Sequence, residues 1–578
     1  MKKLMLGNEA VARGLYEAGV TVVSSYPGTP STEITEFSAN YDEIYAEWAP
    51  NEKVAAEVAF GASVAGGRSF FGMKHVGLNV AADPLYTMSY TGVNGGIVMA
   101  VADDPGMHSS QNEQDSRHHA IAAKVPMLEP SDSAECLSFT KTAYELSEQF
   151  DTPVIIRLST RVSHSQSLCE LSDRVNIPNK PYIKNVAKYV MMPAMAKGRH
   201  VFVEERTNKL REYAETSPLN CTIYNSTKVG VITSGAAYCY AAEALGNTVS
   251  YLKLGIVNPL PEKLILDFAA KCDKIYVIEE LDGIIEEHCK ALGIKVIGKE
   301  LFGLIGELSQ EIIAEKILGK TFDSVNFTED IPVRPPVMCA GCPHRGVFYC
   351  LSINKIRVSG DIGCYTLGAS APLSSVDTTL CMGASVSGLH GMNKADPEGS
   401  SKTVAVIGDS TFMHSGITGL VNIAYNQSNS TVIVLDNSIT GMTGHQQNPS
   451  TGVNLKGDVT AAVNIESLCK AIGIKRVRVV DPYNLKETDL AIFEELAAPE
   501  PSVIIARRPC ALLKYVKHKP ALVINDCKGC KMCLKLGCPA ISNKDGKAVI
   551  DSVQCVGCGI CTEVCRFGCI NKADGGVN

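Results

Sequence analysis

The chain reads Thr403-Val404-Ala405-Val406-Ile407-Gly408-Asp409-Ser410 at one point and Thr431-Val432-Ile433-Val434-Leu435-Asp436-Asn437-Ser438 further on. Each run is an apolar stretch of strand length that ends in a small polar cluster, and Asn437 follows Asp409 by 28 residues. Ligands of doubly wound sheets bind beyond the carboxyl ends of parallel strands. Carboxylate and amide oxygens are ligands that Mg²⁺ prefers. The two runs therefore predict an α/β domain with a metal site at Asp409 and Asn437.

The two polar clusters resemble the two ends of the thiamine diphosphate motif, which begins Gly-Asp-Gly and ends in Asn. Gly408 and Asp409 match its opening, and Ser410 replaces the third residue with another small one. The resemblance implies that Asp409, Asn437 and the backbone carbonyl of Ile439 bind Mg²⁺, with Gly408 and Ser410 beside the diphosphate. The alternative is a pair of merely structural turns.

A thiamine enzyme also needs a glutamate that hydrogen-bonds the aminopyrimidine ring, and in this superfamily it opens a helix shortly before a glycine. Glu52 lies nine residues before Gly61 and fits that position. Glu57 is a competing choice, and a glutamate in the first turn of a helix is also common for electrostatic reasons alone. We favour Glu52.

The composition is that of an ordinary globular protein. The 578 residues are 45% hydrophobic and 20% charged, with a net charge of −7. This excludes disordered and fibrous classes, and nothing in the charge favours nucleic-acid binding. No apolar run is long enough to span a membrane, and the first residues do not form a secretory signal, so we expect a cytoplasmic protein.

The 22 cysteines are unevenly placed, with six in residues 1–338, seven in 339–510 and nine in 527–578. Dense cysteine clusters in a reducing compartment indicate metal or redox chemistry rather than disulfides. The tail contains two runs of four cysteines, which are Cys527, Cys530, Cys533 and Cys538, and Cys555, Cys558, Cys561 and Cys565. The first three members of the two runs are offset by 28 residues, which indicates an internal duplication.

This spacing is that of the bacterial two-cluster ferredoxins, in which the last cysteine of each run ligates the other cluster. One [4Fe–4S] cluster is therefore expected on Cys527, Cys530, Cys533 and Cys565, and the second on Cys555, Cys558, Cys561 and Cys538. The first run departs from the usual pattern, with four residues rather than three before Cys538. Structural zinc is the alternative. Cys569 lies outside both runs and is expected to be a buried thiol.

Taken together, these features resemble the 2-oxoacid:ferredoxin oxidoreductases along essentially the whole chain, and within them the alpha (large) subunits of the indolepyruvate branch. The matching stretches are residues 26–33, 74–80, 339–345, 360–368 and 441–446.

The resemblance and the alternation of strand-like and helix-like segments predict α/β parallel-sheet domains of the thiamine-diphosphate-binding type plus a ferredoxin-like tail. The expected division is 1–165 (pyrimidine-binding type), 166–330 (connecting segment and transketolase C-terminal-like), 338–515 (diphosphate and Mg²⁺ binding) and 518–578 (two [4Fe–4S] clusters). Residues 170–227 are expected to be connecting structure, and 320–337 a proline-containing linker. The expected strands of the first two domains are Val20–Ser24, Gly96–Val101, Val154–Leu158, Val229–Thr233 and Ile275–Glu279.

Further site residues follow from the same resemblance. Thr29 lies in the Pro-x-Thr-Pro turn at the substrate site of related enzymes, and His445 lies beside the second metal-binding loop. Four cysteines occupy positions like those that ligate a third [4Fe–4S] cluster near thiamine in the pyruvate relatives; they are Cys339, Cys342, Cys364 and Cys510. Buried thiols are the alternative for Cys364 and Cys510. Substrate-pocket residues could also include His75, Asn79, His108, Ser110 and Gln111, for which loop hydrogen bonding is the alternative.

The implied activity is thiamine-diphosphate-dependent oxidative decarboxylation of an aryl-2-oxoacid such as indolepyruvate. Coenzyme A accepts the acyl group, CO₂ is released, and electrons pass through [4Fe–4S] clusters to ferredoxin. A beta subunit is the implied partner, in a heterodimer or a dimer of heterodimers. Two other hypotheses remain: a non-oxidative thiamine-dependent decarboxylase or synthase, and a non-catalytic electron-transfer subunit.

Overall fold

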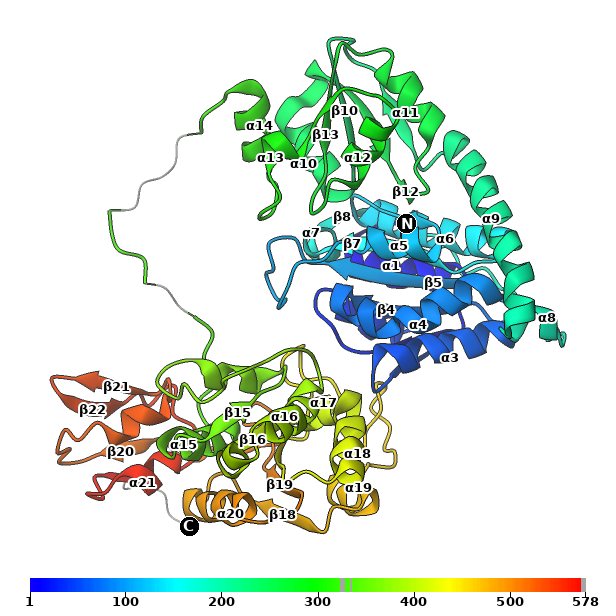
Figure 1. Ribbon diagram of the computed structural model, residues 1–578. Helices are drawn as coiled ribbons and strands as arrows, with labels where there is room; N and C mark the ends of the chain where they lie inside the picture. The colour runs from blue at the N-terminus through cyan, green and yellow to red at the C-terminus, as the bar shows by residue number, and fades with distance from the viewer. Residues whose placement is uncertain (323–327, 333–334, 573–578) are drawn as a thin grey trace. The chain divides into compact units, whose positions relative to one another are not determined.

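The structure is a computed structural model that describes residues 1–322, 328–332 and 335–572. It divides into two compact units, Met1–Thr328 and Glu329–Asn578 (Figure 1). The linker predicted at 320–337 lies partly outside the described residues.

The first unit contains a seven-stranded sheet in the order β12-β6-β7-β5-β4-β2-β3. All neighbours in it are parallel except β12 and β6. Its strands are β2 (Val22–Ser25), β3 (Tyr45–Trp48), β4 (Ser69–Lys74), β5 (Ile97–Asp103), β6 (Met127–Leu128), β7 (Val154–Ser159) and β12 (Ile256–Asn258). The connecting helices include α1 (Gly7–Glu17), α2 (Thr32–Ser38), α3 (Glu52–Val64), α4 (His75–Thr91), α5 (Arg117–Ala123) and α6 (Ser133–Phe150). The parallel sheet and the strands predicted for this part of the chain are confirmed.

A second sheet of the same unit has five strands in the order β14-β13-β10-β11-β9. Only β9 is antiparallel to its neighbour. The strands are β9 (Cys221–Ile223), β10 (Val229–Ser234), β11 (Ser250–Leu254), β13 (Lys274–Ile278) and β14 (Val296–Ile297). Its helices include α10 (Gly235–Leu245), α11 (Glu262–Ala269), α12 (Ile284–Ala291) and α14 (Gln310–Leu318). The two strands predicted for this part of the chain are confirmed.

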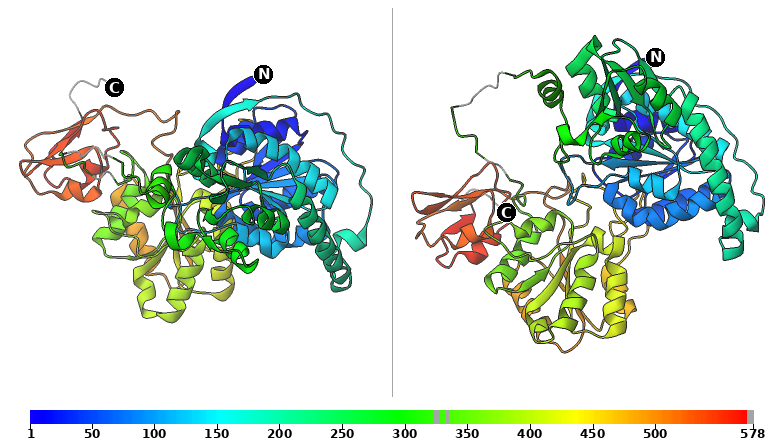
Figure 2. Two further views of the ribbon diagram at one scale, coloured as in Figure 1. Left: turned by 90° about the horizontal axis from the view of Figure 1, so that it is seen from above. Right: turned by 45° about the horizontal axis from the view of Figure 1, so that its top comes forward.

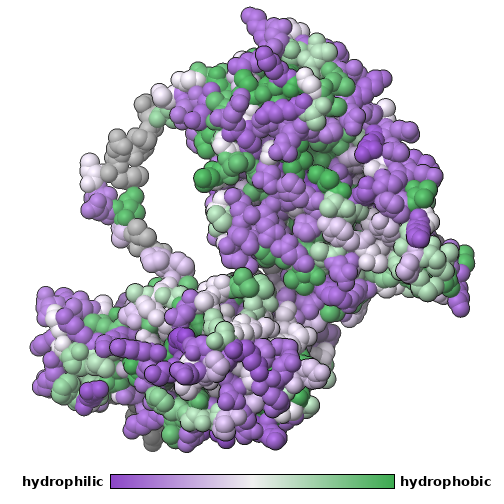
Figure 3. All heavy atoms as spheres, viewed as in Figure 1, coloured by the Kyte–Doolittle hydropathy of each residue, from purple (hydrophilic) through white to green (hydrophobic). Residues whose placement is uncertain are grey.

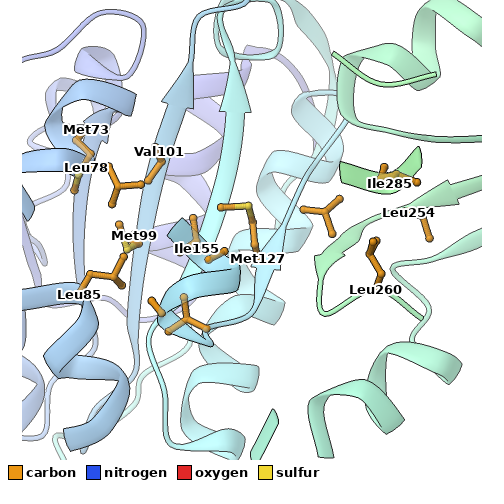
Figure 4. Close-up of a cluster of buried hydrophobic side chains, with 14 of the residues drawn as sticks. Met73, Leu78, Leu85, Met99, Val101, Met127, Ile155, Leu254, Leu260 and Ile285 are labelled. Carbon is orange, nitrogen blue, oxygen red and sulfur yellow. The ribbon is translucent and has the colours of Figure 1, made fainter. Parts of the chain in front are cut away.

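The two sheets share one hydrophobic core. Met99 and Ile155 of the seven-stranded sheet belong to the same buried cluster as Leu254, Leu260 and Ile285 (Figure 4). Full burial of such a side chain stabilises the fold by about 1.5–3 kcal/mol. The shared core explains why residues 1–328 form one unit although they carry two sheets.

One expectation about this unit is wrong. Residues 170–227 are not only connecting structure, because they include the 24-residue helix α9 (Pro193–Thr216). Its Val203, Arg206, Leu210 and Ala214 are buried at helical spacing, while its other face is polar. Pro193 stands in the first turn, where the missing N–H costs nothing. The low hydrophobicity of the stretch concealed the helix in the sequence.

The second unit is built around a five-stranded, fully parallel sheet in the order β15-β16-β17-β19-β18. The strands are β15 (Arg357–Ser359), β16 (Thr403–Gly408), β17 (Thr431–Asp436), β18 (Arg476–Val480) and β19 (Ser502–Arg507). Helices cover both faces of the sheet (Figure 2); they are α15 (His344–Ile353), α16 (Ala384–Ala395), α18 (Ile417–Asn426), α19 (Ile465–Ile472) and α20 (Leu485–Leu496).

The apolar run of β16 is continuous because its side chains pack into hydrophobic cores on both faces of the sheet. Val404 and Val406 belong to the cluster that also contains residues of α15 and α20. Ala405 and Ile407 belong to the cluster formed with α16, α18 and α19. Successive side chains of a strand point to opposite faces, so a sheet covered on both sides needs apolar residues at every position.

The cysteine-rich tail contains two small two-stranded antiparallel sheets, a short 3-10 helix (Met532–Leu536) and a short α-helix. β20 (Leu522–Ile524) pairs antiparallel with β23 (Ile570–Lys572), and β21 (Ile541–Lys544) pairs with β22 (Lys547–Ile550). Helix α21 spans Ile560–Val564. Buried tail residues belong to the same core cluster as residues of α15 and β16, so the tail packs within the second unit.

Hydrophilic and hydrophobic residues are intermixed on the visible surface (Figure 3). Among the residues that the structure describes, no helix has both the length and the apolar character needed to cross a membrane.

Candidate active site

The first group of site residues lies at the carboxyl ends of β16 and β17. These strands are neighbours, with Gly408 opposite Leu435. Asp409 and Asn437, which follow them in the sequence, therefore come together at one edge of the sheet, as the sequence predicts. Both side chains are buried. Burial, and then the nearby Asp436 carboxylate, raises the pKa of Asp409 to about 7.

Three oxygen atoms converge at this edge. The side-chain oxygen of Asn437 faces the Ile439 carbonyl oxygen at 2.8 Å and Asp409 Oδ1 at 3.2 Å, and all three atoms are acceptors. A turn of the amide would let its nitrogen donate to both, whereas a cation between the oxygens would hold them as they are. Octahedral Mg²⁺ with bonds of about 2.1 Å places neighbouring ligand oxygens about 3 Å apart. Asp409 Oδ2 is buried without a hydrogen-bond partner. The residues present fit a magnesium ion.

Close packing surrounds the same edge. A Cβ on Gly408 would lie 2.6 Å from Cε1 of Tyr365, so glycine is required there for steric reasons. Ser410, the departure from the motif, accepts a hydrogen bond from Thr440 Oγ1 at 2.8 Å. His344 is buried, which lowers its pKa to about 4, and its Nε2 lies 3.4 Å from Asn437 Nδ2. Sequence reasoning gave His344 no role, although the stretch at residues 339–345 contained it.

The four cysteines proposed for a third cluster lie near one another beside this edge, without converging on a single point. Burial and the neighbouring Cys510 and Cys339 thiols raise the pKa of Cys364 to about 11. Burial raises the pKa of Cys342 to about 12, with a further contribution from Cys339 and Cys364. Residues far apart in the sequence are thus brought together, which the sequence spacing alone did not show.

This group directly adjoins the oxygen ligands. The backbone N–H of Cys510 donates to the Asn437 carbonyl at 2.9 Å. Cys364 Sγ and Asn437 Nδ2 lie 3.5 and 4.0 Å from the point where a Cβ on Gly441 would stand. The third cysteine group and the predicted diphosphate site are therefore neighbours within one unit.

The tail cysteines surround two separate cavities. One is lined by Cys538, Cys555, Cys558 and Cys561, and the other by Cys527, Cys530, Cys533 and Cys565. Backbone N–H groups donate to sulfur in both sets, from Leu522 to Cys555 Sγ at 3.5 Å and from Cys569 to Cys565 Sγ at 3.3 Å. Cys569 is buried and also lines the second cavity, a position that its sequence spacing did not indicate.

None of these cysteine sets converges on a single point. Within residues 1–322, 328–332 and 335–572, no three His, Cys, Asp or Glu side chains are grouped so that they could hold one metal ion. A structural zinc site requires four ligands within about 2.3 Å of the metal.

In the first unit, the two glutamates considered from the sequence differ in environment. Glu52 is the first residue of α3, whose start is capped by Asn51 Oδ1 accepting from the Val54 N–H at 2.9 Å. Its side chain is buried and packs so closely on α4 that a Cβ on Gly77 would lie 2.6 Å from Glu52 Oε1. Glu57 is exposed and pairs with Lys53.

Other polar residues lie at the carboxyl ends of β4 and β5. Lys74 is close to Asp104 and Glu52, and burial lowers its pKa. Its Nζ donates to the Ser109 carbonyl at 2.9 Å, and Ser110 Oγ donates to Asp104 at 2.7 Å. Sequence reasoning missed Lys74, because only burial distinguishes it from surface lysines.

The remaining predicted pocket residues differ in their surroundings. His75 is buried and bonded to the Asn112 carbonyl, whereas His108 pairs with Glu307. Asn79 and Gln111 are exposed, as is His445 in the second unit, and Thr29 is half-buried in the loop between β2 and α2.

Comparison with known proteins identifies this arrangement. Residues 361–506 match the family described as thiamine pyrophosphate enzyme, C-terminal TPP binding domain. Residues 13–221 match pyruvate flavodoxin/ferredoxin oxidoreductase, thiamine diphosphate-binding. The chain is thus an oxidoreductase built from thiamine-diphosphate-binding domains.

Full-length relatives narrow the class. The chain is 39% identical to indolepyruvate oxidoreductase subunit IorA of Archaeoglobus fulgidus, over 99% of this chain and 98% of that one. It is 40% identical to the IorA subunit of Pyrococcus horikoshii, over 99% and 97% of the two chains. The IorA subunit of Methanothermobacter marburgensis is also 40% identical, over 98% and 96%. The chain belongs to the family of indolepyruvate oxidoreductase IorA subunits, which confirms the resemblance found in the sequence.

Proposed function

We propose that this chain is the large subunit of an indolepyruvate:ferredoxin oxidoreductase. An aryl-2-oxoacid and coenzyme A react to give an aryl-acetyl-CoA, CO₂, one proton and two electrons, and the electrons leave singly to ferredoxin. The family names support an indolepyruvate substrate. The observation that supports the proposal is the proximity of Cys364 Sγ and of the Cys510 backbone N–H to the Asn437 loop, since these cysteines lie next to the predicted cofactor site.

Asp409, Asn437 and the Ile439 carbonyl would hold Mg²⁺ and through it the diphosphate, with Gly408 and Ser410 beside them. Thiamine diphosphate, when bound, supplies an electron sink for the carbon that loses CO₂. Glu52 would bind the aminopyrimidine and hold the proton exchanged with that ring, and its burial keeps water from competing for the carboxylate. Thr29 and His445 would contact the substrate.

Three cysteine groups in the second unit would hold [4Fe–4S] clusters. Two are the cavities of the tail, whose linings contain the same four-cysteine sets as the crossed ferredoxin pairing. The third is the group of Cys339, Cys342, Cys364 and Cys510. Cysteines around a cavity suit a cube of several atoms, whereas zinc needs ligands directed to one point.

We propose the domains 1–165, 166–330, 338–515 and 518–578, of which the first two correspond to the first compact unit and the last two belong to the second. A beta subunit would complete the enzyme as a heterodimer or a dimer of heterodimers. Reduced cysteines and electron delivery to ferredoxin would suit the cytoplasm.

The test is an anaerobic assay of the purified complex with a viologen dye. We expect dye reduction that requires both an arylpyruvate and coenzyme A. Release of an aldehyde without dye reduction would instead support a non-oxidative decarboxylase. Absence of bound thiamine diphosphate from an active electron-transfer complex would support a non-catalytic subunit.

A further inference from the structure

Arg345 is the second residue of α15, and its positively charged side chain is buried. Only 2% of the residue is exposed. Its Nη1 donates to the Leu536 carbonyl at 2.6 Å, and its Nη2 donates to the carbonyls of Met338 and Cys339 at 2.7 and 3.0 Å. Its Nε is buried without a hydrogen-bond partner.

No carboxylate compensates this charge. Among the described residues, no Asp or Glu oxygen lies within 4.0 Å of the Arg345 guanidinium. Burial of an unpaired charge is costly, so buried arginines are normally paired. Arg117, which is also buried, pairs with Asp115 and Glu279. Even Arg206, which bonds mainly to carbonyls, has Asp151 nearby.

The cysteines around Arg345 belong to two different sets. Arg345 Nη2 donates to the Cys339 carbonyl at 3.0 Å, and the Arg345 backbone N–H donates to the Cys342 carbonyl at 3.3 Å; both cysteines belong to the set beside the cofactor site. Arg345 also lines the cavity of Cys538, Cys555, Cys558 and Cys561, together with Ala340 and Gly341 of the loop between Cys339 and Cys342. The guanidinium thus stands in the wall between two proposed cluster sites.

We infer that Arg345 is the built-in counter-charge of these two clusters, and that it raises the reduction potential of each, so that each accepts an electron more readily. This inference rests on the proposed function. One electron enters a cluster and later leaves it, with no bond made or broken; with its four thiolates, the cluster changes from two negative charges to three. A fixed cation stabilises the more negative state.

The residue type suits this role. Arginine stays charged at any physiological pH, and its planar group presents five N–H donors, which suits the three carbonyls that it bonds. In the interior the attraction is screened far less than in water. The carbonyl bonds to Cys339 and Leu536 hold the guanidinium between the two walls. Arg345 is therefore a positioning and tuning residue rather than a catalytic one.

The test is a redox titration of the full complex with dithionite, followed by EPR under anaerobic conditions, with iron measured per chain. Arg345→Gln removes the charge, and Arg345→Lys keeps it. We expect Arg345→Gln to shift the reduction equilibrium of the affected clusters at least tenfold toward the oxidised form, which is 59 mV for a one-electron couple. Arg345→Lys should stay within about threefold of the wild type.

Two references sharpen the comparison. The cavity of Cys527, Cys530, Cys533 and Cys565 does not include Arg345, so its cluster should keep its potential in both variants. Arg566→Gln removes the same charge next to Cys565, but from an exposed side chain, and should have little effect because solvent screens it.

Each outcome decides the question. Loss of a cluster from Arg345→Gln but not from Arg345→Lys would support the inference, because the charge itself would then be needed. Unchanged potentials in Arg345→Gln with intact iron would overturn it. So would loss of the clusters from Arg345→Lys, because the guanidinium would then serve only to join two loops. A wild-type complex without clusters would refute the proposed function instead.

Discussion

Replacement of Gly408 by alanine tests the geometry of the predicted cofactor edge. The new Cβ would stand 2.6 Å from Cε1 of Tyr365. The backbone angles of Gly408 are ordinary, so the ring contact is the source of the cost. Tyr365 has little freedom to move, because it is buried, its hydroxyl donates to the Ile362 carbonyl at 2.9 Å, and its ring packs edge-on against His344.

Overpacking of this kind costs about 1–3 kcal/mol of unfolding free energy. For a unit of this size, each kcal/mol lowers the melting temperature by about 2–4 °C. The strain also falls next to Asp409, so we expect affinity for thiamine diphosphate with Mg²⁺ to decrease by about tenfold or more, equivalent to about 1.4 kcal/mol.

Calorimetry of unfolding and titration of the cofactor measure these two effects. Gly391→Ala is the control, because no atom lies within 4 Å of its new Cβ and the helix α16 should gain slightly. The cost of Gly408→Ala should largely vanish when Tyr365 is also replaced by alanine. An equal cost in both backgrounds, or unaltered cofactor affinity, would refute the steric argument.

Three other variants follow. Glu52→Gln should lower turnover by about 10²–10⁴-fold, which is the range for loss of a proton-transferring group. Glu57→Gln changes an exposed side chain and should keep the turnover of the wild type. Equal losses in the two variants would contradict the choice of Glu52. Burial raises the pKa of Glu280 to about 7, so the folded chain holds a proton that the unfolded chain releases near its usual pKa of 4.5. The free energy of unfolding should therefore fall by about 3 kcal/mol as pH rises from 4.5 to 7. Denaturant titrations at several pH values should show a weaker pH dependence in Glu280→Gln, and an equal pH dependence in the two proteins would contradict this. Cys364→Ser should remove about four iron atoms per chain and leave the tail signals in EPR spectra; unchanged iron would exclude Cys364 as a ligand.

Much of the fold could be predicted from local sequence patterns. The continuous apolar run of β16 is short and rich in β-branched residues, which favours a strand buried on both faces over a buried helix. The cysteine spacing of the tail likewise predicts its two groups, because three members of each group stand close together in the sequence and the fourth ends the other run. Both are features that neighbouring residues decide.

Features that depend on contacts between residues distant in the sequence could not be predicted from it. The meeting of Cys364 and Cys510 with Asn437 depends on how three loops fold over one sheet edge. The sequence favoured Glu52 over Glu57 by its spacing to Gly61, but the burial of Glu52 depends on its packing against α4. Arg345 looks like any arginine until the carbonyls of Leu536 and Cys339 surround it. Helix α9 was missed because its apolar stripe is narrow within a polar stretch.

The central claim is that electrons released by decarboxylation at the Asp409 edge pass to cysteine-bound clusters. The content of iron, sulfide and thiamine diphosphate in the anaerobically purified complex tests this claim most directly. We predict about twelve iron atoms and an equal amount of sulfide for each large subunit, with one thiamine diphosphate. A content of about eight iron atoms would show that only the two tail clusters are present. It would exclude the cluster beside the cofactor and with it the proposed electron-transfer route. Zinc in place of iron would contradict the account.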